Sequence, residues 1–300
     1  MVQAGCRTIL KAIINSMKAY LTLLSSANYL RGLLVLHRSL KAHQPSYPLI
    51  VWITDEVVKS NPELLDILDS QEVQYEFLED TFEISESAAA EFSSHRWGAT
   101  FDKLKLFSMT QFEKIVLLDS DMLITKNIDH LFDLPHLTSC CESDLVTGFE
   151  DWSLPNSGMM VIEPEEGLGQ KVFDVWPVVQ QRKPIFGDQD LIHEYFRAIF
   201  TRNEDWRIPA KFNCFTKLTD QIIAERGYNL NLEAPDDGTI AILHFCIHIK
   251  PWLATKTQRA ELYENLESVS KTAEIRAHKL YDEYLAKVDL ALSEILAEQA

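Results

Sequence analysis

Two aspartates separated by one residue, Asp119 and Asp121, directly follow an apolar run of the chain. The run Ile115–Leu118, with Met122–Ile124 beyond it, is rich in leucine and β-branched side chains and predicts a buried strand. Because side chains alternate across a strand, both carboxylates face the same way if the extended conformation persists through Ser120. Such a pair forms a hard oxygen site suited to Mn²⁺ or Mg²⁺. The structural alternative is an Asp-rich loop in which one carboxylate caps a neighbouring element.

Three further residues could take part in chemistry, and each also has an ordinary structural interpretation. His244 lies in the predicted strand Ile240–Phe245, where a histidine is more often a satisfied core or edge residue than a metal ligand. Lys103 and Lys105 lie near the start of a helix predicted over Phe101–Phe112, which leads into the aspartate strand. Most lysines are solvated surface charges, so the residue type alone leaves a binding role open.

Composition narrows the classes of partner. The chain has 300 residues, of which 46% are hydrophobic and 24% charged, as expected for one large globular domain or a domain with an appendage. Its formal net charge of −17 argues against a nucleic-acid partner and against an anionic membrane surface. A bound phosphate group must then be held by a local metal ion and by local Lys or Arg side chains, because the overall field repels it.

Cysteine usage and hydropathy predict the compartment. The cysteines are odd in number, scattered and without a Cys-x-x-Cys pair, at positions Cys6, Cys140, Cys141, Cys214 and Cys246. This pattern is typical neither of a disulfide framework nor of a zinc ribbon, and it indicates a reducing compartment. No run approaches the roughly 18 apolar residues of a transmembrane helix, and residues 1–18 hold no convincing signal-peptide cleavage site. We therefore expect a cytoplasmic protein.

Strands and helices alternate along the first part of the chain. Apolar runs predict strands and leucines at helical spacing predict helices, in the order Ala19–Leu24, Tyr29–His43, Leu49–Thr54, Pro62–Leu68 and Val73–Leu78. This alternation is typical of an α/β, Rossmann-like fold with a mostly parallel sheet flanked by helices. Ligands bind beyond the carboxyl ends of the strands in such sheets, and the aspartate pair lies at one of these ends.

The middle of the chain is expected to hold one excursion and several shorter elements. An acidic segment of small residues between Asp80 and Phe101 predicts an excursion over the site. The other predicted elements are a loop with Cys140-Cys141, strands Leu145–Phe149 and Met159–Ile162, turns Asp151–Gly158 and Pro184–Gln189, helices Val172–Val179 and Leu191–Phe200, and an extended stretch Ile208–Phe215. The sequence contains no glycine-rich phosphate loop of the Walker or dinucleotide type.

The composition changes at about Lys256. Glycine and proline disappear, and apolar side chains recur at helical spacing at Tyr281, Leu285, Val288, Leu292 and Ile295. One or two amphipathic helices are expected, packed on the domain or forming a dimer contact. The predicted division is an N-terminal arm (1–18), a catalytic domain (19–255) and C-terminal helices (256–300).

Five motifs, taken in order, resemble one family. They are AYLTLL…GLLVLHRSL, FDKLKLFSMTQFEKIVLLDSDMLITKNIDHLFDLP, PNSGMMVIEP, GDQDLI and HFCIHIKPW, and they run from Ala19 to about Trp252. The chain resembles the glycogenin and galactinol synthase group of retaining glycosyltransferases, which belongs to glycosyltransferase family 8 and has the GT-A fold. The resemblance implies a hexosyltransferase that uses a UDP-sugar.

The resemblance also implies roles for individual residues. Asp119, Asp121 and His244 are expected to bind Mn²⁺, or Mg²⁺ in its place. Asp188 and Gln189 are the expected catalytic residues. The residues expected to surround the donor are Leu23, Ser25, Tyr29, Lys103, Asp119, Ser120, Asp121, Asn156, Ser157, Gly158, Asp188, Gln189, Ile247 and Lys250.

The chemistry implied by the family is transfer with retention of configuration. A divalent ion and Lys250 would stabilise the charge that develops on the diphosphate leaving group. The transition state is expected to resemble an oxocarbenium ion. In front-face displacement the leaving phosphate accepts the proton of the acceptor, and Asp188 stabilises or positions the reacting sugar.

Two departures from glycogenin bear on the diphosphate contact and on the acceptor, respectively. Ile247 stands where glycogenin has a glycine near the diphosphate, and the stretch Phe212–Asp220, where glycogenin carries the tyrosine that it glucosylates, has no tyrosine. We therefore expect glucose or galactose to pass to a separate acceptor, either a polyol or small glycoside or a protein-linked glycan. The alternatives are a self-glucosylating primer, a catalytically silent nucleotide-sugar-binding protein and a hydrolase of nucleotide sugars. The chain could act as a monomer or a homodimer.

Overall fold

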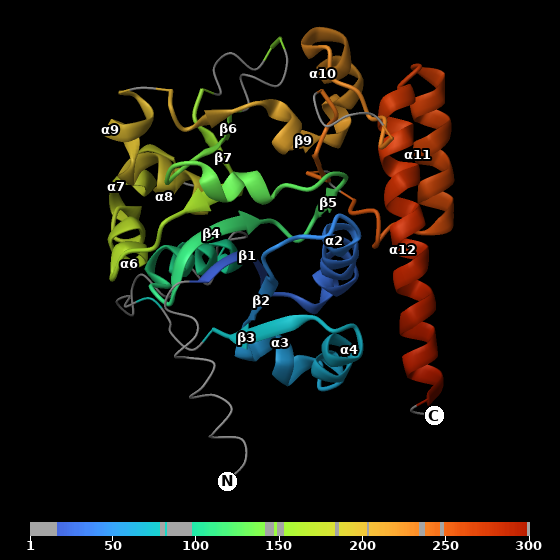
Figure 1. Ribbon diagram of the computed structural model, residues 1–300, viewed down its shortest axis with the longest axis horizontal. Coiled ribbons are helices and arrows are strands. Elements are labelled where there is room, and N and C mark those ends of the chain that lie inside the picture. Colours follow the sequence, from blue (N-terminus) through green and yellow to red (C-terminus); the bar gives the residue numbers. More distant parts are fainter. Residues whose placement is uncertain are drawn as a thin grey trace.

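The computed structural model describes residues 17–78, 82, 98–141, 147–148, 153–183, 186–202, 204–233, 238–246 and 249–298. Its central sheet has the strand order β3 (Gln74–Phe77), β2 (Leu49–Ile53), β1 (Met17–Leu24), β4 (Phe112–Leu118), β7 (Pro155–Ile162), β6 (Ser139–Cys141) and β8 (Arg207–Ile208). The first four strands are parallel, β7 is antiparallel to β4 and β6, and β8 is parallel to β6. The predicted α/β fold with a mostly parallel sheet is confirmed (Figure 1).

A smaller sheet begins just after the end of β4. In it β5 (Met122–Ile124) pairs antiparallel with β10 (Ile242–His244), and β10 pairs in parallel with β9 (Cys214–Phe215). This register sets His244 opposite Met122, the residue directly after the aspartate pair. The small sheet therefore brings a segment from late in the chain to the end of the central strand.

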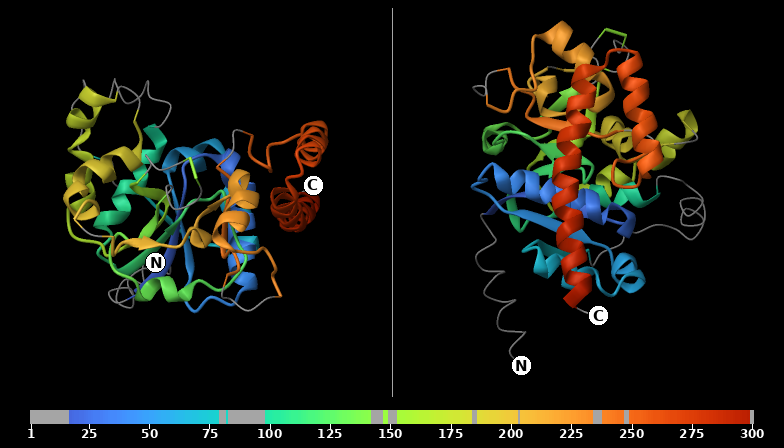
Figure 2. Two further views of the ribbon diagram at one scale, coloured as in Figure 1. Left: turned by 90° about the horizontal axis from the view of Figure 1, so that it is seen from above. Right: turned by 90° about the vertical axis from the view of Figure 1, so that its right-hand side faces the viewer.

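Helices cover both faces of the central sheet. They are α2 (Leu30–Ala42), α3 (Asp55–Ser60), α4 (Leu64–Ser70), α6 (Leu168–Phe173), α7 (Trp176–Arg182), α8 (Asp188–Tyr195), α9 (Arg197–Phe200), α10 (Thr219–Arg226), α11 (Lys256–Ser268) and α12 (Thr272–Glu298). Figures 1 and 2 show α6 to α9 on one side of the sheet and α2 on the other, with α11 and α12 outermost beyond α2.

The central strands are apolar over most of their length because both of their faces are buried there. Leu21 of β1 and Leu117 of β4 lie in a core with residues of α6, α8 and α9. Leu24 at the end of β1 lies in a second core with Leu33 of α2 and Tyr281 of α12. The strand ends that carry the polar residues are therefore fixed from both sides.

The C-terminal helices pack on the domain. Tyr281, Leu285 and Val288 of α12 are buried, and α12 contacts α2 and α10. An ion pair from Arg31 of α2 to Asp289 of α12, with 2.5 Å between Nη2 and Oδ2, ties the same two helices. The predicted apolar face of this segment thus covers the core of its own chain. Among the described helices, none is both long and apolar enough to cross a membrane.

The helix predicted over Phe101–Phe112 is wrong in type and in extent. The structure has a 3₁₀ helix, η2, over Gly98–Ser108, and the last residue of the predicted range opens β4. The core side chains here recur every three residues, at Phe101, Leu104 and Phe107, and all three are buried. A 3₁₀ helix has three residues per turn and therefore places them on one face.

Two predicted loops belong instead to strands. Cys140-Cys141 lies in β6, a short strand held by pairing with β7. The predicted turn Asp151–Gly158 is wrong from Pro155 onward, because β7 starts there. The small and polar residues Asn156–Gly158 obscured this strand, since they face the polar residues described below rather than an apolar core.

The remaining differences are shifts and interruptions. The predicted helix Pro62–Leu68 corresponds to α4, and α3 was not predicted. The predicted helix Val172–Val179 overlaps both α6 and α7, and the predicted helix Leu191–Phe200 overlaps both α8 and α9. The predicted extended stretch Ile208–Phe215 is interrupted by the 3₁₀ turn η5 (Ala210–Phe212). Most of the predicted excursion between Asp80 and Phe101 and most of the predicted strand Leu145–Phe149 lie outside the described residues. The described part of the latter, Thr147 and Gly148, forms a turn.

Candidate functional site

The aspartate pair lies in a tight turn between the two sheets. The backbone N–H of Asp119 donates to the carbonyl of Gly158 in β7 at 2.8 Å, and the N–H of Met122 donates to the carbonyl of Asp119 at 3.2 Å. The extended conformation therefore does not persist through Ser120, which corrects the expectation of simple strand alternation. The carboxylates converge because the turn, rather than the pleat, directs them.

Asp121 is contacted by two basic side chains. Its Oδ1 lies 3.0 Å from Nε2 of His244, and its Oδ2 lies 2.6 Å from Nζ of Lys250. Nε2 of His244 is also 3.9 Å from Oδ2 of Asp119. His244 is buried and reaches this position because β10 pairs with β5. The structure thus brings together four residues that the sequence analysis singled out from distant motifs.

Lys103 joins Asp119 to a second carboxylate, that of Asp188. Its Nζ lies 2.8 Å from Oδ1 of Asp119 and 3.2 Å from Oδ2 of Asp188. Asp188 is the first residue of α8, an end of the helix that favours negative charge, and it accepts a 2.8 Å hydrogen bond from Oγ of Ser157. Lys103 is buried, so the solvated-surface interpretation of this lysine does not apply.

The charges in this cluster shift the pKa values of its members. Burial acts to raise the pKa of Asp121, but His244 and Lys250 outweigh burial and lower it. Burial raises the pKa of Asp119, with Lys103 opposing. Burial acts to lower the pKa of Lys103, but its two carboxylate partners raise it above the usual value. The cluster is therefore a set of buried, mutually compensating charges.

A chain of hydrogen bonds fixes the orientation of His244. Oδ1 of Asn156 accepts from the backbone N–H of Gly158 at 2.9 Å, which identifies that atom as the oxygen. Asn213 must then present its amide nitrogen to the same oxygen, at 2.8 Å, and its own Oδ1 to Nδ1 of His244, at 2.7 Å. Nδ1 is therefore a donor, and Nε2 faces the aspartates. Burial acts to lower the pKa of His244, but Cys246 and Asp121 outweigh burial and raise it well above its usual value, so Nε2 donates to Asp121 and would offer its lone pair to a cation once its proton is released.

Gly158 is required by a close approach. A Cβ atom at this position would lie 2.5 Å from Cε1 of His244, 2.9 Å from Oδ1 of Asn156 and 3.1 Å from Oδ2 of Asp119. The backbone of β7 therefore forms one wall of the cluster, and the absence of a side chain here lets the imidazole lie against it.

Gln189 is anchored to the same strand. Its Oε1 accepts from Nδ2 of Asn156 at 3.1 Å and from the backbone N–H of Ser157 at 3.0 Å. The predicted residues of the Asn-Ser-Gly and Gly-Asp-Gln motifs thus form one connected network with the aspartates.

The residues predicted at the nucleotide end lie beside this network. Leu21 of β1 pairs with Leu117 of β4. Leu23 and Asp119 are each two residues beyond this pair along the two parallel strands, so they lie at the same end of the sheet, and Ser25 directly follows β1. The ring of Tyr29 contacts the edge of Trp252, with 5.4 Å between ring centroids. Ile247 lies outside the described residues.

The donor atoms around the turn fit a divalent cation. Buried Asp121 and half-buried Asp119 supply the carboxylate oxygen ligands that Mn²⁺ and Mg²⁺ prefer, and His244 offers Nε2. One further group was noted only as part of a motif: Sγ of Cys246 lies 2.9 Å from Nε2 of His244. Asn213 was not predicted either, although a polar residue within an apolar extended stretch is a signal of a buried hydrogen-bond partner.

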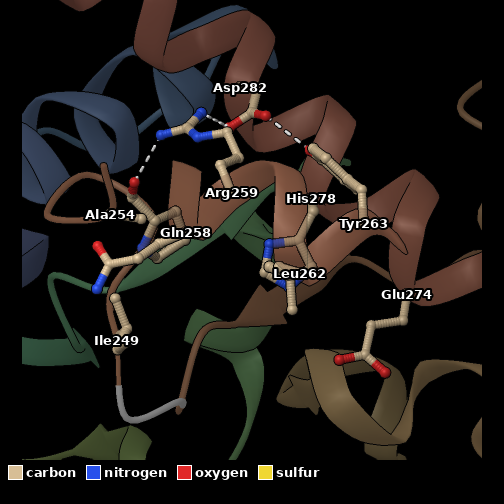
Figure 3. A pocket seen from close by; sticks show the side chains of 10 residues that line it. Ile249, Ala254, Gln258, Arg259, Leu262, Tyr263, Glu274, His278 and Asp282 are labelled. Carbon is tan, nitrogen blue, oxygen red and sulfur yellow. Dashed lines mark hydrogen bonds and ion pairs between the residues drawn. The ribbon is translucent and has the colours of Figure 1, made fainter. Parts of the chain in front are cut away.

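A separate cavity of about 240 Å³ lies between the 249–254 segment and the helices α11 and α12 (Figure 3). Arg259 of α11 pairs with Asp282 of α12 and donates to the carbonyl of Pro251 at 2.7 Å, while Tyr263 donates to Asp282 at 2.6 Å. These contacts hold the segment that carries Lys250, so the C-terminal helices help to position this lysine in the charged cluster.

Comparison with known proteins shows what this chain is similar to. The family model described as glycosyl transferase family 8 matches residues 20–142. Glycogenin-1 of Oryctolagus cuniculus is 27% identical over 252 residues, covering 81% of this chain and 69% of the relative. Galactinol synthase 6 of Arabidopsis thaliana is 24% identical over 286 residues, covering 85% of this chain and 79% of the relative. The chain spans 62% of the length of glycogenin-1 of Homo sapiens.

Solved structures share the fold. A galactosyltransferase named LgtC, crystallised with donor and acceptor sugar analogs, superposes with a TM-score of 0.56 at 16% identity, covering 90% of this chain and 96% of that one. The glycosyltransferase GlyE of Streptococcus pneumoniae has a TM-score of 0.56 at 16% identity, covering 94% of this chain and 64% of that one. With its GT-A fold, a match to the glycosyltransferase family 8 model over residues 20–142 and its motifs in order, this chain is a glycosyltransferase similar to the glycogenins and galactinol synthases.

Proposed function

We propose that this chain is a divalent-ion-dependent hexosyltransferase that moves glucose or galactose, with retention, from a UDP-sugar to a hydroxyl of a separate acceptor. The observation that carries the proposal is the cluster at the end of β4. There Asp119, Asp121 and His244 meet two lysines, Lys103 and Lys250, in a chain with a net charge of −17. Two cationic side chains, buried Lys103 and half-buried Lys250, beside a metal-binding set of donors suit an anionic diphosphate in an otherwise repulsive field.

Asp119, Asp121 and His244 would hold Mn²⁺, or Mg²⁺ in its place. The bound ion supplies Lewis-acid stabilisation of the charge that develops on the leaving diphosphate. Lys250 would add a second positive charge there, and its contact with Asp121 keeps its ammonium group at the edge of the ion site. Asn213 would keep the lone pair of His244 directed at the ion.

Asp188 and Gln189 would face the donor sugar. Lys103 connects Asp188 to Asp119, so the carboxylate that would stabilise positive charge on the reacting carbon is fixed relative to the ion site. Gln189 and Asn156 would offer hydrogen bonds to the sugar. In front-face displacement the leaving phosphate takes the acceptor proton, so this scheme requires no separate general base from the chain.

The acceptor is proposed to be a polyol, a small glycoside or a protein-linked glycan. The likeness to galactinol synthases supports the first two, and the likeness to glycogenins supports the third. The absence of tyrosine in Phe212–Asp220 disfavours self-glucosylation by the glycogenin route. Location in the cytoplasm remains a prediction that follows from the sequence, as does the division into an arm, a catalytic domain and C-terminal helices.

A product analysis tests this proposal. The protein is incubated with Mn²⁺, UDP-glucose or UDP-galactose and a mixture of polyols, glycosides and glycopeptides, and the anomeric proton of the product is observed by NMR. We expect one small-molecule or glycopeptide product with an α-linkage, and unchanged mass of the protein itself. An inverted β-linked product would contradict retention, and a mass increase of the chain would favour self-glucosylation.

A further inference from the structure

Cys246 lies where the ion-binding edge of His244 points. It follows β10 by two residues and is half-buried. Its Sγ is 2.9 Å from Nε2 of His244, and Sγ, Nε2 and a carboxylate oxygen of Asp121 all lie within 4.8 Å of one another. A thiol, an imidazole and a carboxylate therefore lie close together beside the small sheet.

The direction of the thiol is informative because the two ring nitrogens of His244 have different partners. Nδ1 is occupied by Asn213, which leaves Nε2 as the coordinating atom. Sγ contacts Nε2 and not Nδ1, so the thiol shares the side of the ring that faces the aspartates. The thiol therefore approaches the ring nitrogen that would coordinate the ion, and a bound cation could bridge the two atoms.

The other described cysteines have different surroundings. Cys140, Cys141 and Cys214 are buried, and Sγ of Cys140 contacts the carbonyl of Pro209 at 3.3 Å. Burial raises the pKa of Cys214 to about 12, which keeps that thiol protonated. Among the described cysteines, Cys246 is the one that meets a cluster of acidic and imidazole groups.

We propose that Cys246 is a further ligand of the divalent ion, beside Asp119, Asp121 and His244. This inference rests on the proposed function, because it requires the ion site to exist. On binding, a sulfur–metal bond forms, the S–H bond breaks and its proton passes to solvent, with no change of oxidation state. Thiolate sulfur favours softer ions, so the site should bind Zn²⁺ and Co²⁺ more tightly, and Mg²⁺ less well, than an all-oxygen-and-nitrogen site would.

The absorption spectrum of the Co²⁺-loaded protein tests this directly. A thiolate bound to Co²⁺ gives an intense charge-transfer band in the near ultraviolet, which carboxylate and imidazole ligands do not give. We expect this band in the wild type and its loss in Cys246→Ser, together with at least about a tenfold weaker Zn²⁺ affinity. Cys6→Ser removes one thiol elsewhere in the chain and should keep the band.

The outcomes separate this inference from the proposed function. If Co²⁺ binds to the wild type, is lost in Asp121→Asn and yet gives no thiolate band, the ion site stands and Cys246 is not a ligand. A band that persists in Cys246→Ser would also overturn the inference. If the wild type binds no divalent ion, with or without UDP, both proposals fail. The wild-type spectrum suffices as a test should the Cys246→Ser chain fail to fold.

Discussion

The carboxylate of Asp121 contacts both the imidazole of His244 and the ammonium group of Lys250. Replacing it with asparagine keeps the shape and removes the charge. We expect Asp121→Asn to fold and to weaken the joint binding of Mn²⁺ and UDP by at least about 100-fold, because an anionic ligand is lost. Calorimetric titration measures this, with circular dichroism as the check on folding.

A matched control for this variant lies further along the same segment. Asp133 is exposed and stands at the end of η3 (Asp129–Asp133). Asp133→Asn also removes one negative charge, so it should leave the affinity within about twofold of the wild type. Unchanged affinity in Asp121→Asn would remove this residue from the ion site.

Asp188 tests the second half of the cluster. We expect Asp188→Asn to bind UDP as the wild type does and to lower the turnover number by about 100-fold or more, because it would act mainly on charge that develops at the sugar. Steady-state kinetics with the preferred donor separate the two effects. Asp190→Asn, two residues along the same helix, removes the partner of Lys183 and of the Gly187 N–H. It should cost stability and spare turnover, whereas wild-type turnover in Asp188→Asn would exclude Asp188 from the mechanism.

The residue types that could bind a metal and a diphosphate were readable from the sequence, but their connections were not. Asp119 and Asp121 could be recognised from residue type and spacing, whereas the roles of His244 and Lys250 followed from the family resemblance. Asn213 lies in none of the family motifs, and its role depends on a hydrogen-bond chain through Asn156 that only three-dimensional contacts define.

At the scale of elements, α2 packs through Gly32 against the turn that contains Ser120 and against the turn that contains Trp252. A Cβ atom at Gly32 would lie 2.8 Å from Cη2 of Trp252 and 3.0 Å from the carbonyl oxygen of Ser120. Alanine in a helix normally stabilises by about 1 kcal/mol relative to glycine. Here we expect Gly32→Ala to lower the free energy of unfolding by about 1–3 kcal/mol, because neither neighbour has room to move.

Urea unfolding measures this change, and a double-mutant cycle identifies its cause. In a Trp252→Leu background the added methyl group meets a smaller side chain, so the cost of Gly32→Ala should fall by about 1 kcal/mol or more. Stabilisation by Gly32→Ala in the wild-type background would show that the helix does not press on these turns. Weaker binding of Mn²⁺ and UDP should accompany the destabilisation, since the displaced turn carries the aspartate pair.

The contact of α12 with the domain should weaken in acid because of His278. This side chain is buried beside Phe245 and Tyr263, and its Nε2 has no hydrogen-bond partner among the described residues (Figure 3). Burial, with Arg259 nearby, lowers the pKa of His278 from its usual 6.5 to about 4. Between these values the unfolded chain binds the proton more readily, so stability is lost as the pH falls.

The variant His278→Gln isolates this effect from other titrating groups, including His37, whose pKa burial also lowers to about 4. From about pH 8 to about pH 5 the wild type should lose about 2 kcal/mol more stability than His278→Gln. Urea unfolding at both pH values gives the comparison, with the value at high pH as the internal reference. Equal losses in the two proteins would mean that His278 is solvated or already charged in the fold.

Element order was predictable and element boundaries near the site were not. The apolar runs determined β1, β2 and β4, because parallel strands buried on both faces have a clear pattern. The edge strand β3, which is only partly buried, was also predicted. The start of β7 was missed, since its first residues face polar groups. The segment η2 was taken for an α-helix, although its buried positions follow a period of three. The first error occurs where the chain faces the charged cluster, and the second where a 3₁₀ helix carries core residues.

At the scale of the whole molecule, the two sheets meet at the Asp119–Asp121 turn. The central sheet ends there, the small sheet starts there, and α11 and α12 hold the segment with Lys250 against it. In a molecule of net charge −17, Lys103 and Lys250 place two positive charges beside the carboxylates of Asp119 and Asp121. This arrangement suits a small anionic donor and not an extended anionic polymer.

The most direct test of this account is release of UDP by the wild-type protein in the presence of Mn²⁺. A panel of UDP-sugars is tested with and without a mixture of polyols, glycosides and glycopeptides. The account predicts release from UDP-glucose or UDP-galactose that requires the ion and rises strongly with one class of acceptor. Tight binding of Mn²⁺ and UDP with no release under any of these conditions would contradict it and favour a protein that only binds nucleotide sugars.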